Sequence, residues 1–541
     1  MQSGSPLRRV VEEFFARLLD HHPEVGTQLG LHQYDPFMPK AGKEAVEADK
    51  RLVIEFREKL LSIDPQALSE DERIDRELAI QMAELSIFNI EEWPMWRMMP
   101  YAPEVVGGAL YPLFTREYAP YSVRFRSIVS RLSQVPEYLE KSRELLEDPV
   151  RVFVDIGIEM SRAMSAFVGM ILETSKQLLG EYAREYEEYF HKASDAINRY
   201  AEWLMSVRDK AREDFAMGPE RFRRLLKLRG IDMEPEEILR FGEEKLAEYK
   251  RELARLADLI KPGASIEEVK RMLEAEHPKS FREVLEAYRA AVERARRFVV
   301  EKGLATIPPN EELRVLETPP YLIPIIPFAA YIPPAKFEGR LTGIYLVTPV
   351  DESKLSRHNY YSISNTSVHE AYPGHHLQLS CAMLNDSLVR LMVEAPEFVE
   401  GWAHYCEDLM KEHGFDDTPK HRFVQLLDGV WRAARVIIDV KLSTGQMSFE
   451  EAVEFLVRET GMDREAAKAE VKRYTYTPGY QLSYLLGKHM FKELREYAKK
   501  RLGSKFSERW FHDTLLYAGS VPIKYAKAIL DREIEKLLSK R

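Results

Sequence analysis

The segment His369-Glu370-Ala371-Tyr372-Pro373-Gly374-His375-His376-Leu377-Gln378 decides how this chain is read. Five of the 14 histidines in 541 residues lie between His358 and His404, and three of them belong to this segment. A stretch of that length would hold about one histidine by chance. The clustering indicates a chemical role for the segment, and its His-Glu opening is that of HExxH, the zinc-binding helix motif.

The spacing of the histidines differs from HExxH, where the second histidine lies one helical turn after the first. Here it lies six or seven residues later, which in a regular helix is about 9 or 10.5 Å along the axis. Ligand bonds near 2 Å cannot span that distance, so either no metal binds or the helix is irregular. Pro373 removes a hydrogen bond to the carbonyl of His369, and Gly374 permits unusual backbone angles. A wide turn there brings His375 or His376 back toward His369, and the spacing does not choose between them.

A third ligand is expected downstream. Glu400, in Glu400-Gly401-Trp402-Ala403-His404-Tyr405, lies 25 residues after His375. That distance allows a second helix to return antiparallel to the first, and Asn385-Asp386-Ser387 suits the turn between them. Two histidines, one carboxylate and one open position are typical of a hydrolytic zinc site.

A tyrosine-rich segment follows near the C-terminus. Pro478-Gly479 precedes a helical run that carries Tyr480 and Tyr484 one turn apart. A phenol aimed at the metal is suited to stabilise an oxyanion. Arg473, just before this segment, is suited to pair with a substrate carboxylate.

Outside these motifs the chain has mostly helical periodicity. Apolar residues recur at helical spacing over residues 7–19 and over roughly 43–62, 71–91, 122–148, 160–214, 235–260 and 279–302. Residues 306–350 are rich in Pro, Tyr, Ile, Val and Thr, and 313–318 and 341–348 are predicted strands of a small antiparallel sheet. Helical patterns return from about residue 365. We therefore expect a mainly α protein with two packed lobes, residues 1–305 and 306–541.

The composition excludes several classes of protein. Lys plus Arg is 78 and Asp plus Glu is 88, a formal net charge of −10, which is unfavourable for binding nucleic acid or an anionic membrane surface. No stretch approaches the roughly 18 apolar residues of a spanning helix, and the N-terminal segment has no apolar centre of a signal peptide. Two cysteines do not make a disulfide framework. A cytoplasmic location is predicted.

Four segments together carry a family resemblance: HEAYPGHHLQ (369–378), EGWAHY (400–405), RYTYTPGYQLSY (473–484) and FHDTLLYAGSVPI (511–523). They closely resemble the domain-of-unknown-function 885 family. That family is distantly similar to HExxH…Glu zinc peptidases such as thimet oligopeptidase, carboxypeptidase Taq and angiotensin-converting enzyme. In the closer family an Arg-rich helix runs into Asp-x-x-Leu-His; here Arg432, Arg435 and Asp439 are present, but Ser443 stands at the histidine position.

The resemblance implies a two-lobed, helical, metallopeptidase-like fold whose small sheet lies beside the active-site cleft. It also implies one zinc per chain and a role for each matching residue. His369 is the first zinc ligand, Glu370 the general base, His375 (in preference to His376) the second ligand, Glu400 the third ligand, and Tyr484 the oxyanion donor.

The predicted function is hydrolysis of oligopeptides by metal-activated water. Tyr484, with His376, is expected to stabilise the oxyanion, while Arg473 and Tyr480 bind substrate. The strand at Gly343–Val347 is expected to pair with an extended peptide. The alternatives are a metal-dependent hydrolase of a non-peptide amide or ester, a non-haem iron oxygenase, and a catalytically degenerate helical peptide-binding protein. Endopeptidase or exopeptidase mode is not readable from the sequence.

Overall fold

The chain divides into two compact units in a computed structural model that describes residues 4–318, 323 and 329–539. Unit 1 comprises Met1–Phe215, Pro320–Ile325 and Ala335–Gly339, and unit 2 comprises Ala216–Pro319, Ile326–Pro334 and Arg340–Arg541. The main division therefore falls after Phe215 and not at the predicted residue 305. The reason is that the helices between residues 216 and 305 pack on the second half of the chain.

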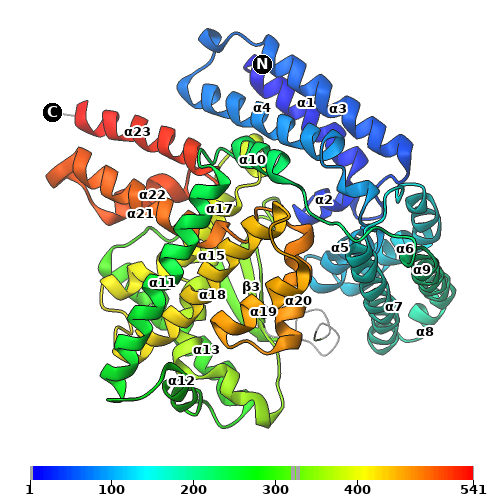
Figure 1. The fold of residues 1–541 in the computed structure, drawn as a ribbon. Coiled ribbons are helices and arrows are strands. Elements are labelled where there is room, and N and C mark those ends of the chain that lie inside the picture. The colour runs from blue at the N-terminus through cyan, green and yellow to red at the C-terminus, as the bar shows by residue number, and fades with distance from the viewer. Residues whose placement is uncertain (1–3, 319–322, 324–328, 540–541) are drawn as a thin grey trace. The chain divides into compact units, whose positions relative to one another are not determined.

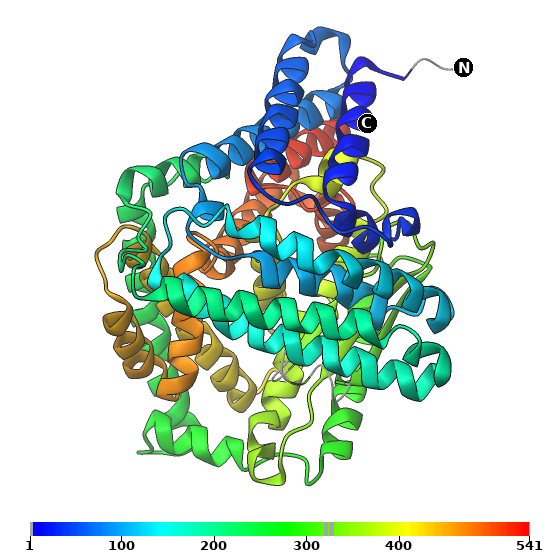
Figure 2. The same cartoon turned by 90° about the vertical axis from the view of Figure 1, so that its right-hand side faces the viewer.

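Unit 1 is helical. Its amphipathic helices bury one stripe each; in α1, for example, Phe14 stacks on Phe56 of α3 with ring centroids 3.9 Å apart. The long helices α7 and α9 lie side by side (Figures 1 and 2). The helices are α1 (Pro6–His21), α2 (Pro23–Gln28), α3 (Lys43–Ser62), α4 (Glu70–Glu91), α5 (Ala102–Thr115), α6 (Tyr121–Arg143), α7 (Arg151–Leu179), α8 (Glu181–Arg184) and α9 (Glu187–Arg208).

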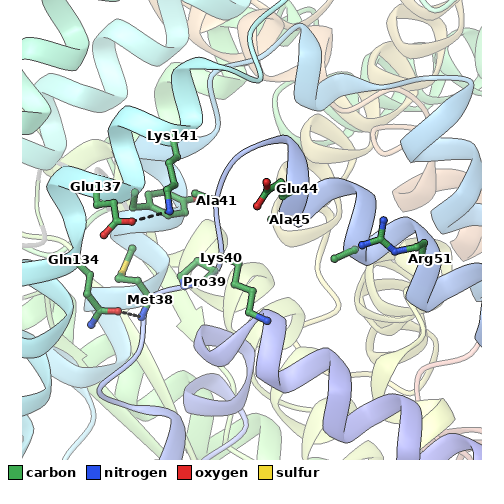
Figure 3. Close-up of a pocket in the computed structure, with 12 residues that line it drawn as sticks. Met38, Pro39, Lys40, Ala41, Glu44, Ala45, Arg51, Gln134, Glu137 and Lys141 are labelled. Atoms are coloured by element: carbon green, nitrogen blue, oxygen red, sulfur yellow. Dashed lines mark hydrogen bonds and ion pairs between the residues drawn. The ribbon is translucent and has the colours of Figure 1, made fainter.

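A cavity of about 490 Å³ lies in unit 1 among residues of α3, α6 and the segment before α3. Its wall carries both charge signs, and Lys141 pairs there with Glu137 (Figure 3). None of the residues that the sequence singles out for chemistry lines this cavity. The residues of the predicted site, from His369 to Tyr484, all belong to unit 2.

Unit 2 is built around α18, whose residues are buried along most of its length. Helix α11 packs along α18 (Figure 1), and α13 packs on α14 and on the sheet. The helices are α10 (Pro219–Leu228), α11 (Pro235–Ile260), α12 (Ile266–Glu274), α13 (Phe281–Lys302), α14 (Tyr360–Glu370), α15 (His375–Ala382), α16 (Leu388–Met392), α17 (Pro396–Glu412), α18 (Pro419–Ser443), α19 (Phe449–Thr460), α20 (Arg464–Tyr476), α21 (Ser483–Leu502), α22 (Glu508–Leu516) and α23 (Ile523–Ser539).

The sheet of unit 2 has the order β1-β3-β2, with β1 at Glu311–Glu317, β2 at Ala329–Ile332 and β3 at Leu341–Val347. Strand β3 runs parallel to β1 and antiparallel to β2, so the prediction of an antiparallel sheet is wrong for one of its two pairings. From Ile344 to Val347, β3 is paired on both sides. Its backbone groups are therefore already used there, which contradicts the expected pairing of this strand with a substrate peptide.

Helices α17 and α21 approach each other through two glycines. A Cβ atom added to Gly401 would lie 2.5 Å from the backbone of Gly487, and one added to Gly487 would lie 2.1 Å from the carbonyl oxygen of Glu397. Only glycine allows such a close helix crossing, because any side chain would overlap the opposite backbone. This crossing fixes Glu400, which neighbours Gly401, against the start of α21.

Replacement of Gly401 by alanine is expected to force the two helices apart and to lower the free energy of unfolding by about 1–3 kcal/mol. Denaturant unfolding of the purified chain measures the effect. The matched control is Gly169→Ala within α7, where an added Cβ meets nothing within 4 Å. That substitution is expected to leave stability unchanged or to raise it by up to about 1 kcal/mol. Equal effects of the two substitutions would contradict the close-crossing argument.

Candidate metal centre

The segment 369–378 contains a sharp turn between two helices. Helix α14 ends at Glu370, α15 begins at His375, and the Tyr372–Pro373 peptide bond between them is cis. The chain turns back so closely that a Cβ atom on Gly374 would lie 1.8 Å from the carbonyl oxygen of His369. The predicted irregularity is thus a complete break of the helix, and it requires glycine at position 374.

The break brings together three of the predicted ligands. The ring centroids of His369 and His375 are 4.8 Å apart, and the rings are nearly perpendicular. The Nε2 atoms of His375 and His369 lie 3.3 and 3.9 Å from Oε2 of Glu400. Their ligand atoms all lie within 4.8 Å of one another, and all three residues are buried.

These distances fit a zinc ion. Bonds of about 2.0–2.2 Å to nitrogen and oxygen in a tetrahedral site place ligand atoms roughly 3.3 Å from one another. Two imidazoles and a carboxylate are also the donor set of many catalytic zinc sites. Burial alone would lower the pKa of His375, but the adjacent Glu400 carboxylate outweighs it, so the pKa is raised. The carboxylate thus already favours positive charge at this point.

His376 points elsewhere, so of the two candidate histidines only His375 lies with His369 and Glu400. Its Nε2 lies 2.6 Å from Oε2 of Glu311 on β1, and its Nδ1 lies 2.9 Å from the hydroxyl of Tyr331 on β2. The ring is fully buried. Because both ring nitrogens are engaged by the sheet, the prediction that His376 stabilises an oxyanion is wrong for this structure. His376 instead joins the start of α15 to β1 and β2.

Behind His369 lies a buried polar group that sequence reasoning missed. Nδ1 of His369 lies 2.8 Å from Oε1 of Glu407, which also accepts a hydrogen bond from Arg432 at 3.0 Å. Asn365 donates to the other oxygen of Glu407 at 3.0 Å. This arrangement directs Nε2 of His369 toward Glu400, as outer carboxylates do for metal-binding histidines. The sequence did contain one signal for Glu407. It lies seven residues after Glu400, so two helical turns place both side chains on the same face of the helix.

The charge of Glu407 is strongly favoured despite complete burial. Burial by itself would raise the pKa of this carboxyl, but Arg432, His404 and the hydrogen bond from His369 hold it well below its usual range. The ionised carboxylate therefore accepts a hydrogen bond from the Nδ1–H group of His369. That leaves Nε2 of His369 as the lone-pair nitrogen for a metal.

Helix α17 also holds the sharp turn in place. Nε1 of Trp402 donates to the carbonyl oxygen of Pro373 at 2.7 Å, and the indole is completely buried. The residue two positions before Trp402 is Glu400, the predicted third ligand. One short stretch of α17 therefore positions both the third ligand and the turn that brings the first two together.

The two tyrosines lie at the site in unequal ways. The hydroxyl of Tyr480 donates to Oε1 of Glu400 at 2.7 Å. The ring of Tyr484 meets that of Tyr480 edge to face, with centroids 6.1 Å apart, and the Arg435 guanidinium lies 4.9 Å from the centre of the Tyr484 ring. Tyr480 is thus a partner of the third ligand, whereas the prediction assigned it to substrate binding.

A buried aspartate holds the turn that carries both tyrosines. Asp439 accepts hydrogen bonds from the backbone N–H groups of Gly479 at 2.8 Å and Leu482 at 2.9 Å. Ser443 donates to the same carboxyl group at 3.3 Å. Gly479 has a φ of +78°, which favours glycine. Burial raises the pKa of Asp439 to about 6, although the two backbone donors oppose the rise.

Arg473 lies in an ion-pair cluster. Its guanidinium donates to Oε2 of Glu470 at 2.8 Å, and the same oxygen accepts from Arg435 at 3.0 Å and from the hydroxyl of Tyr474 at 2.8 Å. The side chain of Arg473 is 38% exposed, so part of the guanidinium faces solvent. The structure therefore pairs Arg473 with Glu470 and does not bring it to the three ligands; its role in substrate binding stays a prediction.

Replacement of Asp439 by asparagine is expected to change the pH dependence of stability. In the folded chain this carboxyl keeps its proton up to about pH 6, and an ordinary carboxyl releases it near 3.8. The stabilisation that this group contributes is therefore complete below pH 3.8 and is lost as the pH rises through 6. Relative to Asp439→Asn, the metal-free chain should lose up to about 3 kcal/mol between pH 4 and 7. Denaturant titrations at several pH values give the free energy of unfolding of both proteins. If that free energy changes with pH equally in the two proteins, the prediction is contradicted.

Among the solved structures that resemble the chain are "a putative lipoprotein of unknown function from Shewanella oneidensis" (TM-score 0.80, 22% identity) and "the putative lipoprotein from Colwellia psychrerythraea" (TM-score 0.85, 19% identity). Each match covers 98% of this chain and 100% of the other. At these identities the likeness shows a shared fold, mainly helical with a small sheet. No curated protein matches the sequence.

The predicted cytoplasmic location and the distant similarity to zinc peptidases stay predictions. Within residues 4–318 and 329–539, no helix is long and apolar enough to cross a membrane.

The family prediction is confirmed, because residues 23–530 match the family described as "Bacterial protein of unknown function (DUF885)". This chain therefore belongs to the DUF885 family of bacterial proteins.

Proposed function

We propose that this protein is a zinc-dependent peptidase that hydrolyses oligopeptides. The observation that carries the proposal is the convergence of His369, His375 and Glu400. Glu370 follows His369 in the chain, and its charge acts on His375. When bound, zinc supplies a Lewis acid and lowers the pKa of a bound water to about 7. The side chains around it supply the proton transfers and the charge stabilisation.

Glu370 suits the role of general base. It is the last residue of α14, follows the ligand His369, and is partly exposed. Among the residues that the structure describes, its carboxylate makes no hydrogen bond or ion pair, so it is available to a water molecule. Burial is the main reason that the pKa of Tyr345 is raised, and the charge of Glu370 adds to the rise. Glu370 would take the proton of the attacking water and return it to the leaving amine.

Tyr484 remains the better oxyanion donor of the two tyrosines. The hydroxyl of Tyr480 is used by Glu400, and His376 is used by the sheet. Burial and the nearby Glu400 raise the pKa of Tyr484, so its phenol keeps its proton at neutral pH. A protonated phenol can donate a hydrogen bond to a developing oxyanion, and such donors are typically worth about 3–4 kcal/mol.

The preference for peptides rests on the resemblance to HExxH…Glu peptidases. The same side chains could cleave another amide or an ester, so a non-peptide hydrolase is the second candidate. A free carboxylate next to the ligands argues against a degenerate binding protein, because a purely structural metal site has no need of a base. Ligands presented from helices argue against an iron oxygenase, which usually presents them from strands.

Glu370→Gln is expected to keep the metal and to lose turnover by about 10²–10⁴-fold, because the amide cannot accept the water proton. Zinc content by elemental mass spectrometry and cleavage of a diverse peptide library measure the two effects. Glu394→Gln, at an exposed position, serves as the matched control and should cleave at the rate of the unmodified chain. Full turnover by Glu370→Gln would remove Glu370 from the mechanism.

Glu407→Gln is expected to weaken zinc binding by about 10–100-fold, because the neutral amide no longer fixes the tautomer and orientation of His369. Competition with a chromophoric chelator measures the affinity. Glu370→Gln, which leaves the ligands and Glu407 intact, should bind zinc as tightly as the unmodified chain. Equal affinities for all three proteins would show that Glu407 does not support the metal centre.

A further inference from the structure

A second cavity in unit 2 has a charge imbalance of its own. It has a volume of about 220 Å³ and lies among residues of α11, α17, α18 and α21. None of the three metal-ligand candidates lines it. Its charged wall includes Asp408 and Lys411 of α17 and Lys488 and Lys492 of α21.

The other charges of the wall are balanced by partners outside the cavity. Glu252 accepts two hydrogen bonds from Arg255, at 2.7 and 2.8 Å. Glu412 accepts one from Arg495 at 2.6 Å. Arg422 pairs with Asp417. These groups therefore leave no net charge for the cavity.

Three ammonium groups then remain in the wall with one carboxylate, and that carboxylate, of Asp408, pairs with two of them. Oδ1 of Asp408 accepts hydrogen bonds from Lys488 at 2.8 Å and from Gln425 at 2.7 Å. Oδ2 of Asp408 pairs with Lys492. Lys411 forms no ion pair with any residue in the described part of the chain. Its ammonium donates only to the carbonyl oxygen of Phe415, at a long 3.3 Å. The wall therefore carries an excess of two positive charges.

The excess positive charge is partly buried, and burying a charge costs free energy. Lys411 is 3% exposed and Lys488 is 7% exposed, whereas the side chain of Lys492 is 40% exposed at the mouth. Burial lowers the pKa of Lys411 to about 8, although nearby acidic groups oppose the shift. The acidic groups near Lys411 are paired with arginines: Asp416 with Arg294, Asp417 with Arg422 and Glu407 with Arg432. Buried cations are normally paired, so Lys411 lacks a counter-charge of its own. A ligand anion would supply it.

We propose that this cavity binds a small oxyanion with two negative charges, of the phosphate or dicarboxylate type, held by Lys411, Lys488 and Lys492. The charge follows from the excess of two. The size follows from the volume, which is below the roughly 300–1,000 Å³ of pockets for drug-sized ligands. Solvent access at Lys492 provides the entrance.

The position of the cavity gives such an anion a role. Helix α17 carries Glu400 as well as Asp408 and Lys411, and α21 begins beside Tyr480 and carries Lys488 and Lys492. An anion bridging these lysines ties the two helices together beyond their glycine crossing. It would stabilise the pair of helices that frames the metal centre. The inference stands on the cavity alone and does not depend on peptidase activity.

Thermal unfolding of the metal-free full-length chain tests the proposal. Sulfate, inorganic phosphate and succinate are titrated separately, with ionic strength held constant by sodium chloride. At least one dianion should raise the melting temperature and saturate in the millimolar range, as mass action requires. Saturation separates binding from the general stabilisation by sulfate, which keeps rising with concentration. Phosphate and sulfate acting alone would identify a tetrahedral oxyanion, and succinate acting alone a dicarboxylate.

Variants locate the effect. Lys411→Gln and Lys492→Gln should each weaken the apparent affinity by about tenfold, because each removes a charged hydrogen-bond donor. Lys492 lies at the mouth, so its replacement keeps the test valid if Lys411→Gln fails to fold. Lys500→Gln, exposed on the same helix α21, should respond as the unmodified chain. The proposal is overturned if no dianion gives a saturable rise, or if both cavity variants keep it.

Discussion

The close crossing of α17 and α21 at Gly401 and Gly487 is the constraint on which the candidate metal centre depends. Because the backbones touch, the residues that flank the crossing have fixed directions. Glu400 reaches the two histidines and the hydroxyl of Tyr480, and Trp402 reaches the carbonyl of Pro373. The two residues that flank Gly401 thus have separate tasks. Glu400 is the predicted third ligand and accepts from Tyr480, and Trp402 holds the turn between His369 and His375. A wider crossing would displace all of these together.

The buried charges behind His369 are consistent with the candidate metal centre. Glu407 and Arg432 are buried, and a buried ion pair is on balance seldom more stable than apolar packing. Here the carboxylate also receives His369 and Asn365, so its hydrogen-bonding capacity is well used. What the arrangement provides is a fixed tautomer and direction for His369, which matter for a metal ligand and little for packing.

Most helices, and the meeting of His369 with His375, could be predicted from the sequence because they depend on local signals. Amphipathic periodicity marked most helices, and Pro373-Gly374 marked the break that brings His375 to His369. The role of His376 could not be predicted, since its partners Glu311 and Tyr331 come from strands more than 40 residues away. The direction of β1 against β3 was misjudged for a similar reason: two strands with a third between them in sequence can run parallel, and residue patterns do not record that. The unit boundary was missed because helical periodicity does not say which partner a helix packs on.

The departure from the family pattern at Ser443 finds an explanation in the turn at Gly479. Where the closer family has a histidine after Asp-x-x-Leu, this chain has a serine whose hydroxyl donates to Oδ1 of Asp439. The same oxygen accepts the N–H of Gly479, and the second oxygen accepts that of Leu482. Arg229 adds a contact to the carbonyl of Gly479 and a hydrogen bond to Ser483 at 2.9 Å. The turn is therefore held from both sides without a histidine, and Tyr480 still reaches Glu400. With serine at this position the hydrogen bonds of Asp439 hold the turn from which Tyr480 donates to Glu400.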